Sequence, residues 1–240
     1  MERKYIGVKN IISKLELDKL LEVSYAVSTD DARPSLMGVN IKDNTFAAVS
    51  GYVVSTRTCE SLEGLSDVTI QTQIIEAYRA IKDDKKTLIE IIATKEQAGF
   101  KTDKWTIVGK PIEGNFFNYK SIIPKESNIQ VKLESKLLYK ALSEFKKSKY
   151  VILNPTKFGL CISDETSSFI KRINLFQAGL NTDKFNIAVD PKLLMSALKN
   201  YKSTVYMQFT ESVKPIVLMD DVNKTRALDM VLPMRIKKDE

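Results

Sequence analysis

The feature that most constrains the fold of this chain is a segment pattern that occurs four times. Each copy holds a short apolar strand, a polar break and an amphipathic helix built around two adjacent aliphatic residues. These aliphatic pairs begin at Leu20, Ile74, Leu137 and Leu193. Copies one and three are 117 residues apart and copies two and four are 119 apart. A unit of roughly 58 residues is therefore doubled into a domain, and the domain occurs twice.

Strand signals follow each predicted helix. Runs rich in β-branched and aromatic residues, bounded by turn residues, lie at 38–42, 45–49, 87–92, 105–109, 150–153, 158–162, 204–209 and 215–219. Each unit then has the order β-α-β-β-β, which predicts two α+β domains with helices on one face of antiparallel sheet. Proline and charge interrupt the pattern at 123–125, so the expected domains are 1–122 and 123–240.

Each predicted helix is also preceded by a residue that can cap its N-terminus. The candidate N-caps are Asp18, Thr72, Ser135 and Asp190, whose side-chain oxygens can accept hydrogen bonds from the first backbone N–H groups. Pro191 follows Asp190 at the first helical position, where the missing N–H costs nothing.

The composition argues against an enzyme. The chain has no histidine, which removes Ser-His-Asp and Cys-His catalysis and every histidine-ligated metal site. No phosphate-binding glycine loop or calcium-loop spacing occurs. Aspartate pairs at 30–31, 83–84 and 220–221 lie where turns are expected, so turn hydrogen bonding is favoured over a metal or acid/base pair. We expect no catalytic residue, no metal and no cofactor.

The two cysteines, Cys59 and Cys161, form no metal or disulfide motif. They favour a cytoplasmic protein with free thiols over a secreted one. Cys161 is expected to be a small core residue, and Cys59 has no evident activating base. No apolar run is long enough to span a membrane, and no signal core follows Met1. Met1 is a plausible start, and prior removal of an N-terminal domain is left open.

The excess of basic over acidic residues lies entirely in the second half of the chain. Residues 1–120 carry 17 Lys or Arg and 17 Asp or Glu, whereas residues 121–240 carry 20 and 13. On two predicted helices of that half, lysines recur four or seven residues apart, at Lys136, Lys140 and Lys147 and at Lys192 and Lys199. Such ammonium groups can follow a phosphate backbone without reading bases. The alternative is an ordinary solvated surface.

Residues 26–39, 109–124, 190–199 and 230–236 resemble segments of one known family, in the same order: the bacterial DNA polymerase III beta subunit, the sliding clamp. Residues 26–39 resemble the start of its middle domain, 109–124 the passage into its last domain, 190–199 that domain's second helix, and 230–236 its C-terminal tail. The resemblance spans residues from about 12 to 236 and implies the DNA clamp fold. Residues 1–122 would be equivalent to the family's middle domain, and residues 123–240 to its C-terminal domain.

Two departures from the family matter. Two three-domain chains normally close a ring of six domains, whereas this chain has equivalents of only the second and third. Three copies would then complete a ring, so the resemblance implies a homotrimer. In addition, Ser50 replaces the acid and Val53 the arginine of a family turn.

The resemblance implies a non-enzymatic processivity factor that encircles double-stranded DNA without sequence preference. Arg33 and the five lysines named above would face the DNA. A DNA polymerase and a clamp loader would dock through short peptide motifs. The alignment places their pocket at Leu36, Gly51, Tyr52, Val53, Val54, Phe117, Ile122, Leu193, Val213, Pro215, Met230, Val231, Leu232, Pro233, Met234 and Arg235. The alternative for each pocket residue is core or strand packing. The alternative for the protein is a clamp-derived decoy or regulator that binds such motifs without encircling DNA.

Overall fold

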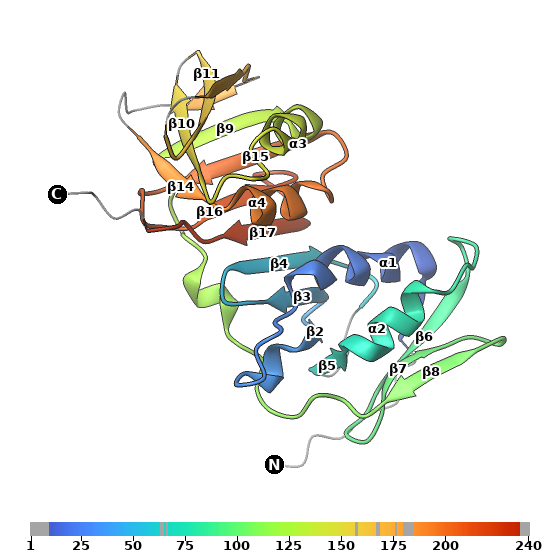
Figure 1. Ribbon diagram of the computed structural model, residues 1–240. Helices are drawn as coiled ribbons and strands as arrows, with labels where there is room; N and C mark the ends of the chain where they lie inside the picture. Colours follow the sequence, from blue (N-terminus) through green and yellow to red (C-terminus); the bar gives the residue numbers. More distant parts are fainter. Residues whose placement is uncertain are drawn as a thin grey trace. The chain divides into compact units, whose positions relative to one another are not determined.

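The computed structural model describes residues 10–235 apart from 63, 64, 66, 157, 167, 168, 176 and 180–184 (Figure 1). The chain divides between Tyr119 and Lys120 into two compact units, which we call unit 1 and unit 2. This division lies a few residues before the predicted boundary at 122/123. The equivalence of the two units to the middle and last domains of the clamp family stays a prediction.

Unit 1 contains two copies of the order β-α-β-β-β (Figure 1). The first copy comprises β1 (Asn10–Ser13), α1 (Lys14–Val23), β2 (Gly38–Lys42), β3 (Thr45–Val49) and β4 (Val53–Thr58). The second comprises β5 (Val68–Gln71), α2 (Thr72–Arg79), β6 (Leu88–Ala93), β7 (Ala98–Lys101) and β8 (Thr106–Gly109). Short 3₁₀ turns, η1 (Ser24–Ala26) and η2 (Pro34–Leu36), link α1 to β2.

Unit 2 repeats this order after the 3₁₀ turn η3 (Tyr119–Ile122). Its first copy comprises β9 (Ile129–Glu134), α3 (Ser135–Ser143), β10 (Val151–Thr156), β11 (Gly159–Asp164) and β12 (Ile170–Ile173), followed by an additional strand, β13 (Gln177–Gly179). Its second comprises β14 (Ile187–Val189), α4 (Pro191–Leu198), β15 (Thr204–Phe209), β16 (Ile216–Met219) and β17 (Ala227–Val231).

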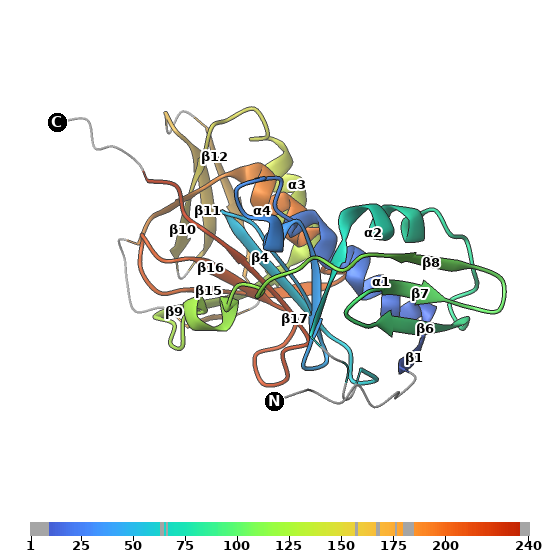
Figure 2. The same cartoon turned by 90° about the horizontal axis from the view of Figure 1, so that it is seen from below.

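The two copies within each unit exchange their first strands. In unit 1, β1 pairs with β6 in the order β1-β6-β7-β8 (Figure 2), while β5 pairs with β2 in the order β5-β2-β3-β4 (Figure 1). In unit 2, β14 pairs with β10 and β9 pairs with β15. The strand pairs within each unit are antiparallel. Neither copy can complete its sheet alone, which gives the four-fold repeat a structural reason.

The helices pack on these sheets and close a core in each unit. In unit 1, Leu17 and Leu20 of α1 are fully buried, as is Phe46 of β3. Tyr78 of α2 packs on Phe100 of β7, with the ring centroids 5.2 Å apart. In unit 2, α3 and α4 pack against each other, and Leu138 is fully buried. Burying such a side chain is worth about 1.5–3 kcal/mol.

The helix starts depart from three of the four predicted N-caps. Asp190 caps α4, since its carboxylate accepts a hydrogen bond from the Lys192 backbone N–H at 2.7 Å. Thr72 and Ser135 are instead the first residues of their helices, and their hydroxyls donate to backbone carbonyls of Met37 and Tyr201. Asp18 was wrongly predicted as a cap, because it lies inside α1.

The α1 error has a physical cause. Ser13 and Glu16 form a capping box that starts the helix at Lys14, a turn earlier than predicted. The aliphatic pair of the first copy therefore occupies a later position in its helix than the pairs of the other three copies. The helices α1 and α2 start at Lys14 and Thr72. The separation between these two starts is closer to the roughly 58-residue sequence repeat than the separation between the first two aliphatic pairs.

Candidate functional site

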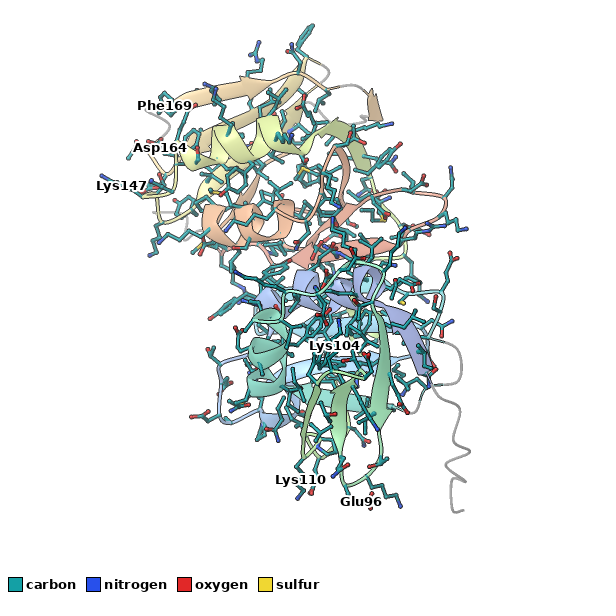
Figure 3. The ribbon with its side chains drawn as sticks, turned by 90° about the vertical axis from the view of Figure 1, so that its right-hand side faces the viewer. Glu96, Lys104, Lys110, Lys147, Asp164 and Phe169 are labelled. Carbon is teal, nitrogen blue, oxygen red and sulfur yellow. The ribbon has the colours of Figure 1, made fainter. Side chains whose placement is uncertain are left out.

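Unit 2 presents a basic face on its two helices. The buried residues of α3 and α4 form one stripe on each helix, and Lys136, Lys140, Lys192 and Lys199 are exposed. Lys147 is exposed in the turn that follows α3, on the side of unit 2 that also carries Phe169 (Figure 3). Within the described residues, none of these five lysine side chains forms an ion pair.

A depression of about 390 Å³ lies between α3 and α4, and we call it the α3–α4 depression. It is lined by Ser135, Lys136, Tyr139, Leu198, Lys199, Tyr201 and Lys202. Two of the predicted lysines, Lys136 and Lys199, therefore come together there. Lys202 was missed, because it follows α4 and falls outside the helical spacing on which the sequence argument relied.

Lys140 lies on the other flank of α3, where a second depression of about 310 Å³ separates α3 from β12. This depression also holds Glu144, whose carboxylate accepts a hydrogen bond from Lys171 at 3.0 Å. The predicted lysines thus fall into different surroundings. Of these two depressions in the described part of unit 2, the α3–α4 depression is the one lined by lysines without an acidic residue.

The helices of unit 1 use their charges within the unit. Lys14 pairs with Asp18 at 2.7 Å, and the buried Arg57 of β4 pairs with Glu22 at 2.9 Å. Lys19 donates to the Thr58 carbonyl at 2.9 Å. The Arg57–Glu22 pair and the Lys19 hydrogen bond hold α1 to β4, whereas the Lys14–Asp18 pair lies within α1. This agrees with the charge balance of the first half of the chain.

Tyr78 of α2 also belongs to this network. The hydroxyl of Tyr78 donates to the Asp18 carboxylate at 2.7 Å. Burial and then this hydrogen bond raise the pKa of Tyr78 far above its ordinary value, so the phenol stays protonated. On α2, Arg79 and Glu76 form an exposed pair at 3.5 Å.

Arg33, also predicted to face DNA, lies directly before η2. Its side chain is exposed and forms an ion pair with Asp30 at 3.4 Å. An exposed pair of this kind holds its partners weakly, so the guanidinium can exchange Asp30 for another anion.

The predicted pocket residues of unit 1 divide by exposure. Leu36, Val53 and Val54 are buried, whereas Tyr52 is 67% and Phe117 43% exposed. Gly51 is exposed as well, in the turn between β3 and β4. Core packing therefore does not account for Tyr52 or Phe117. The three buried residues are not accessible to a peptide, so they would only pack beneath the residues that contact it.

The predicted pocket residues of unit 2 include the C-terminal tail. Met230 and Val231 are buried on β17, while Leu232, Pro233 and Met234 are half-buried and Arg235 is exposed. The Met234 N–H donates to the Ala188 carbonyl at 2.8 Å, which fixes the tail on β14, the last strand of its sheet. This bond presents the tail as an ordered strip rather than a loose end.

The remaining predicted pocket residues of unit 2 are partly or largely accessible. Leu193 of α4 and Pro215 are half-buried, Ile122 is 40% exposed, and Val213 is 70% exposed. Core packing therefore does not account for Val213.

The aspartate pairs take part in turns, as predicted. Asp30 accepts from the Ala32 N–H, and Asp84 from the Lys86 N–H. Asp220 and Asp221 each accept from two backbone N–H groups of the β16–β17 connection. In the described part of the chain, no three His, Cys, Asp or Glu side chains are grouped as a metal site requires.

The two cysteines lie in different surroundings. Burial, and then the Glu16 carboxylate, raise the pKa of Cys59, which keeps this buried thiol protonated. Cys161 is only half-buried on β11, so its expected place in the core was wrong: its side chain lies on the less buried face of that strand. Among the described residues, no helix has the length and apolar character needed to cross a membrane.

Comparison with known proteins identifies relatives of this fold. No family model matches the chain. The beta sliding clamp of Halalkalibacterium halodurans is 26% identical over 241 residues, covering 92% of this chain and 63% of that protein. The beta sliding clamp of Bacillus subtilis is 23% identical over 227 residues, covering 88% and 60%. The chain thus spans less than two thirds of the length of these relatives.

Solved structures give the same result. The DNA polymerase sliding clamp of Bacillus subtilis matches 98% of this chain and 66% of its own, with a TM-score of 0.85 and 21% identity. The DNA polymerase III beta chain of Streptococcus pneumoniae matches 98% and 67%, with a TM-score of 0.83 and 18% identity. The doubled α+β units therefore have the DNA clamp fold, as predicted. The chain is a shorter, two-domain relative of the bacterial beta sliding clamps.

Proposed function

We propose that this protein is a DNA sliding clamp, a cytoplasmic, non-enzymatic processivity factor that encircles duplex DNA during replication and tethers a polymerase. The observation that carries the proposal is the basic face of α3 and α4. Its exposed lysines have no carboxylate partners among the described residues, and they stand on a fold shared with the sliding clamps. Such a surface attracts phosphates without sequence preference. The proposed mechanism needs no metal or cofactor, because the tether is topological.

The proposed ring is a homotrimer. Two units per chain require three chains for six units, with head-to-tail contacts that close on themselves. Two end strands support this arrangement, since β8 is the last strand of one sheet in unit 1 and β12 is the last of one sheet in unit 2. Both carry exposed apolar side chains, with Val108 39% and Ile170 63% exposed, and Phe169 directly before β12 is 46% exposed. Pairing β12 of one copy with β8 of the next would cover them.

The polymerase and the clamp loader would dock through short peptides on the pocket residues. The exposed Tyr52, Phe117 and Val213 and the ordered tail support this part of the proposal, because a groove for aliphatic or aromatic anchors needs accessible apolar side chains. Val53 stands where the family carries arginine, so the preferred peptide would be more apolar.

The tail gives the direct test of peptide docking. Replacing Met234 by Ala should weaken binding of a Gln-Leu-Ser-Leu-Phe peptide by about 1–3 kcal/mol, because the half-buried thioether would contact a buried anchor. Isothermal titration calorimetry measures this change, and light scattering should show an unchanged oligomer mass. The matched control is Met195→Ala on α4, outside the predicted pocket. Equal peptide affinity of the wild type and Met234→Ala would contradict the pocket assignment.

Encirclement is tested by comparing closed and cut DNA. The protein is assembled on circular duplex DNA, washed at high salt, and the circle is then cut at one site. A ring should survive the wash and leave after the cut, because its retention depends on topology. Equal dissociation from circular and linear DNA would contradict encirclement. It would favour the alternative, a clamp-derived decoy that binds interaction peptides without encircling DNA.

A further inference from the structure

The α3–α4 depression combines features that an ordinary solvated surface does not require. Three exposed ammonium groups, of Lys136, Lys199 and Lys202, line one hollow of about 390 Å³. None of its lining residues is acidic. Because none of the three side chains has an ion-pair partner among the described residues, their mutual repulsion is relieved only by solvent, salt or a bound anion.

The floor of the depression is held in place by hydrogen bonds. The buried Ser135 hydroxyl donates to the Tyr201 carbonyl at 2.5 Å, which ties the start of α3 to the segment after α4. Tyr201 in turn donates through its hydroxyl to the Leu218 carbonyl at 3.0 Å. Lys202 follows Tyr201 directly, so its backbone is fixed relative to Lys136. The lysines therefore extend from anchored positions on two elements.

Helix α1, the counterpart of α3 in unit 1, lacks this arrangement. The second residue of α1 is Leu15, at the position that Lys136 has in α3. The first residue, Lys14, is buried and paired with Asp18. The lysine-lined hollow is therefore a feature of unit 2 and does not follow from the repeat itself.

We propose that the α3–α4 depression is a seat for a single backbone phosphate of duplex DNA, bound jointly by Lys136, Lys199 and Lys202. This inference rests on the proposed clamp function and specifies which lysines act together. Phosphate oxygens accept charge-assisted hydrogen bonds from several ammonium groups at once. A shared phosphate would fix the position of the DNA at one point, whereas Lys140, Lys147 and Lys192 would each meet the DNA separately.

The salt dependence of duplex binding tests the shared seat. The triple variant Lys136→Ala/Lys199→Ala/Lys202→Ala is compared with wild type on a short linear duplex over a series of salt concentrations. The logarithmic slope falls by about 0.9 for each phosphate that the protein no longer neutralises. For each copy that binds the DNA, the expected decrease in slope is therefore about 0.9 for one shared phosphate, against about 2.7 for three separate phosphates. Affinity at low salt should fall by about three- to tenfold.

A matched control removes the same charge elsewhere. Lys85→Ala/Lys86→Ala/Lys101→Ala changes three exposed lysines of unit 1 and should leave the slope unchanged. Because all six side chains are exposed, both variants should unfold at the wild-type urea concentration. A second arm titrates wild type with inorganic phosphate in the absence of DNA, following the Tyr139 ring signals by NMR. Weak binding that duplex DNA displaces supports the seat.

The outcomes separate the two proposals. A decrease in slope that corresponds to three phosphates, or unchanged binding of the triple variant while wild type binds DNA, overturns the shared seat and leaves the clamp proposal intact. Inorganic phosphate that binds tightly and is not displaced by duplex DNA overturns the seat in favour of a free anion site. Wild-type protein that neither binds duplex DNA nor remains on circles overturns the clamp function, and the seat with it.

Discussion

The helix pairs of units 1 and 2 have the same place in the fold but use charge in opposite ways. In unit 1, Lys14 and Arg57 pair with carboxylates of α1, and Lys19 binds a backbone carbonyl of the neighbouring strand. In unit 2, Lys136 and Lys199 project from the helices without carboxylate partners among the described residues. The repeat therefore determines where each helix lies, whereas its outward side chains determine what it can bind.

The first prediction concerns the assembly of copies through one end strand of each unit, where the largest effect is expected. Ile170→Asp places a carboxylate on the end strand β12 of unit 2, and Val108→Asp does so on β8 of unit 1. If these strands join neighbouring copies, either change buries an unpaired charge, at a cost of several kcal/mol. Light scattering should then shift from three times the 27.2 kDa chain mass to the single chain, and retention on circular DNA should be abolished.

Leu88→Asp is the control for this experiment. Leu88 is 66% exposed, but its strand β6 is paired on both sides, with β1 and β7. The oligomer mass of this variant should therefore be unchanged. A trimer that persists in both the Ile170→Asp and Val108→Asp variants would rule out ring closure through β8 and β12.

The second prediction concerns DNA affinity. Alanine at Lys136, Lys140, Lys147, Lys192 and Lys199 together should weaken duplex binding by about two orders of magnitude at low salt, because several phosphates are then no longer neutralised. Fluorescence anisotropy with a labelled duplex measures the change in affinity. The same number of alanines at the exposed Lys85, Lys86, Lys95, Lys101 and Lys104 of unit 1 should cost far less. Equal weakening in both variants would mean that net charge, and not the helical face, governs binding.

The third prediction turns from binding to stability. Arg57→Ala should lower the free energy of unfolding of unit 1 by about 1–2 kcal/mol, because it removes a buried side chain together with its 2.9 Å ion pair to the partly exposed Glu22. Lys136→Ala should change stability by less than about 0.5 kcal/mol, since its exposed side chain has no ion pair in the described structure. Urea unfolding followed by circular dichroism measures both. If both changes alter stability equally little, the Arg57–Glu22 pair does not stabilise unit 1, which would contradict the comparison.

The order of helices and strands could be predicted from the sequence, because the spacing of apolar residues differs between helices and strands. All eight predicted strand segments overlap observed strands, and 38–42, 45–49 and 204–209 match their bounds. Strands β4, β7, β12, β13 and β17 were missed. In β4, Thr56 and Arg57 interrupt the apolar run, and Arg57 is buried by virtue of its ion pair with Glu22. A buried charge of this kind is visible only once its partner is placed.

The candidate site was predicted less completely than the fold. Helical spacing found Lys136 and Lys199, but it could not bring in Lys202, which joins them through tertiary packing between α3 and α4. The start of α1 is the opposite case, because its signal was present in the sequence. Ser13 and Glu16 have the spacing of a capping box, which is a stronger start signal than Asp18 alone.

The fourth prediction uses that capping box to compare the helix starts of the two units, and its effect is the smallest. Burial raises the pKa of Glu16, but hydrogen bonds that its carboxylate accepts from the Ser61 hydroxyl and from the N–H and hydroxyl of Ser13 outweigh it and lower the pKa below the ordinary value of 4.5. A depressed carboxyl pKa contributes stability that is fully present above the unfolded-state pKa and is lost as pH falls through the folded-state value. The α1 start should therefore loosen at acidic pH below 4.5. The α3 start has no side-chain cap and should not change.

Hydrogen exchange of the amides in the first turn of each helix measures the difference between α1 and α3, and Glu16→Gln should remove most of this difference. A parallel decrease of protection in both helices, or an unchanged pH response in Glu16→Gln, would assign the acid sensitivity to carboxyl groups elsewhere in the chain.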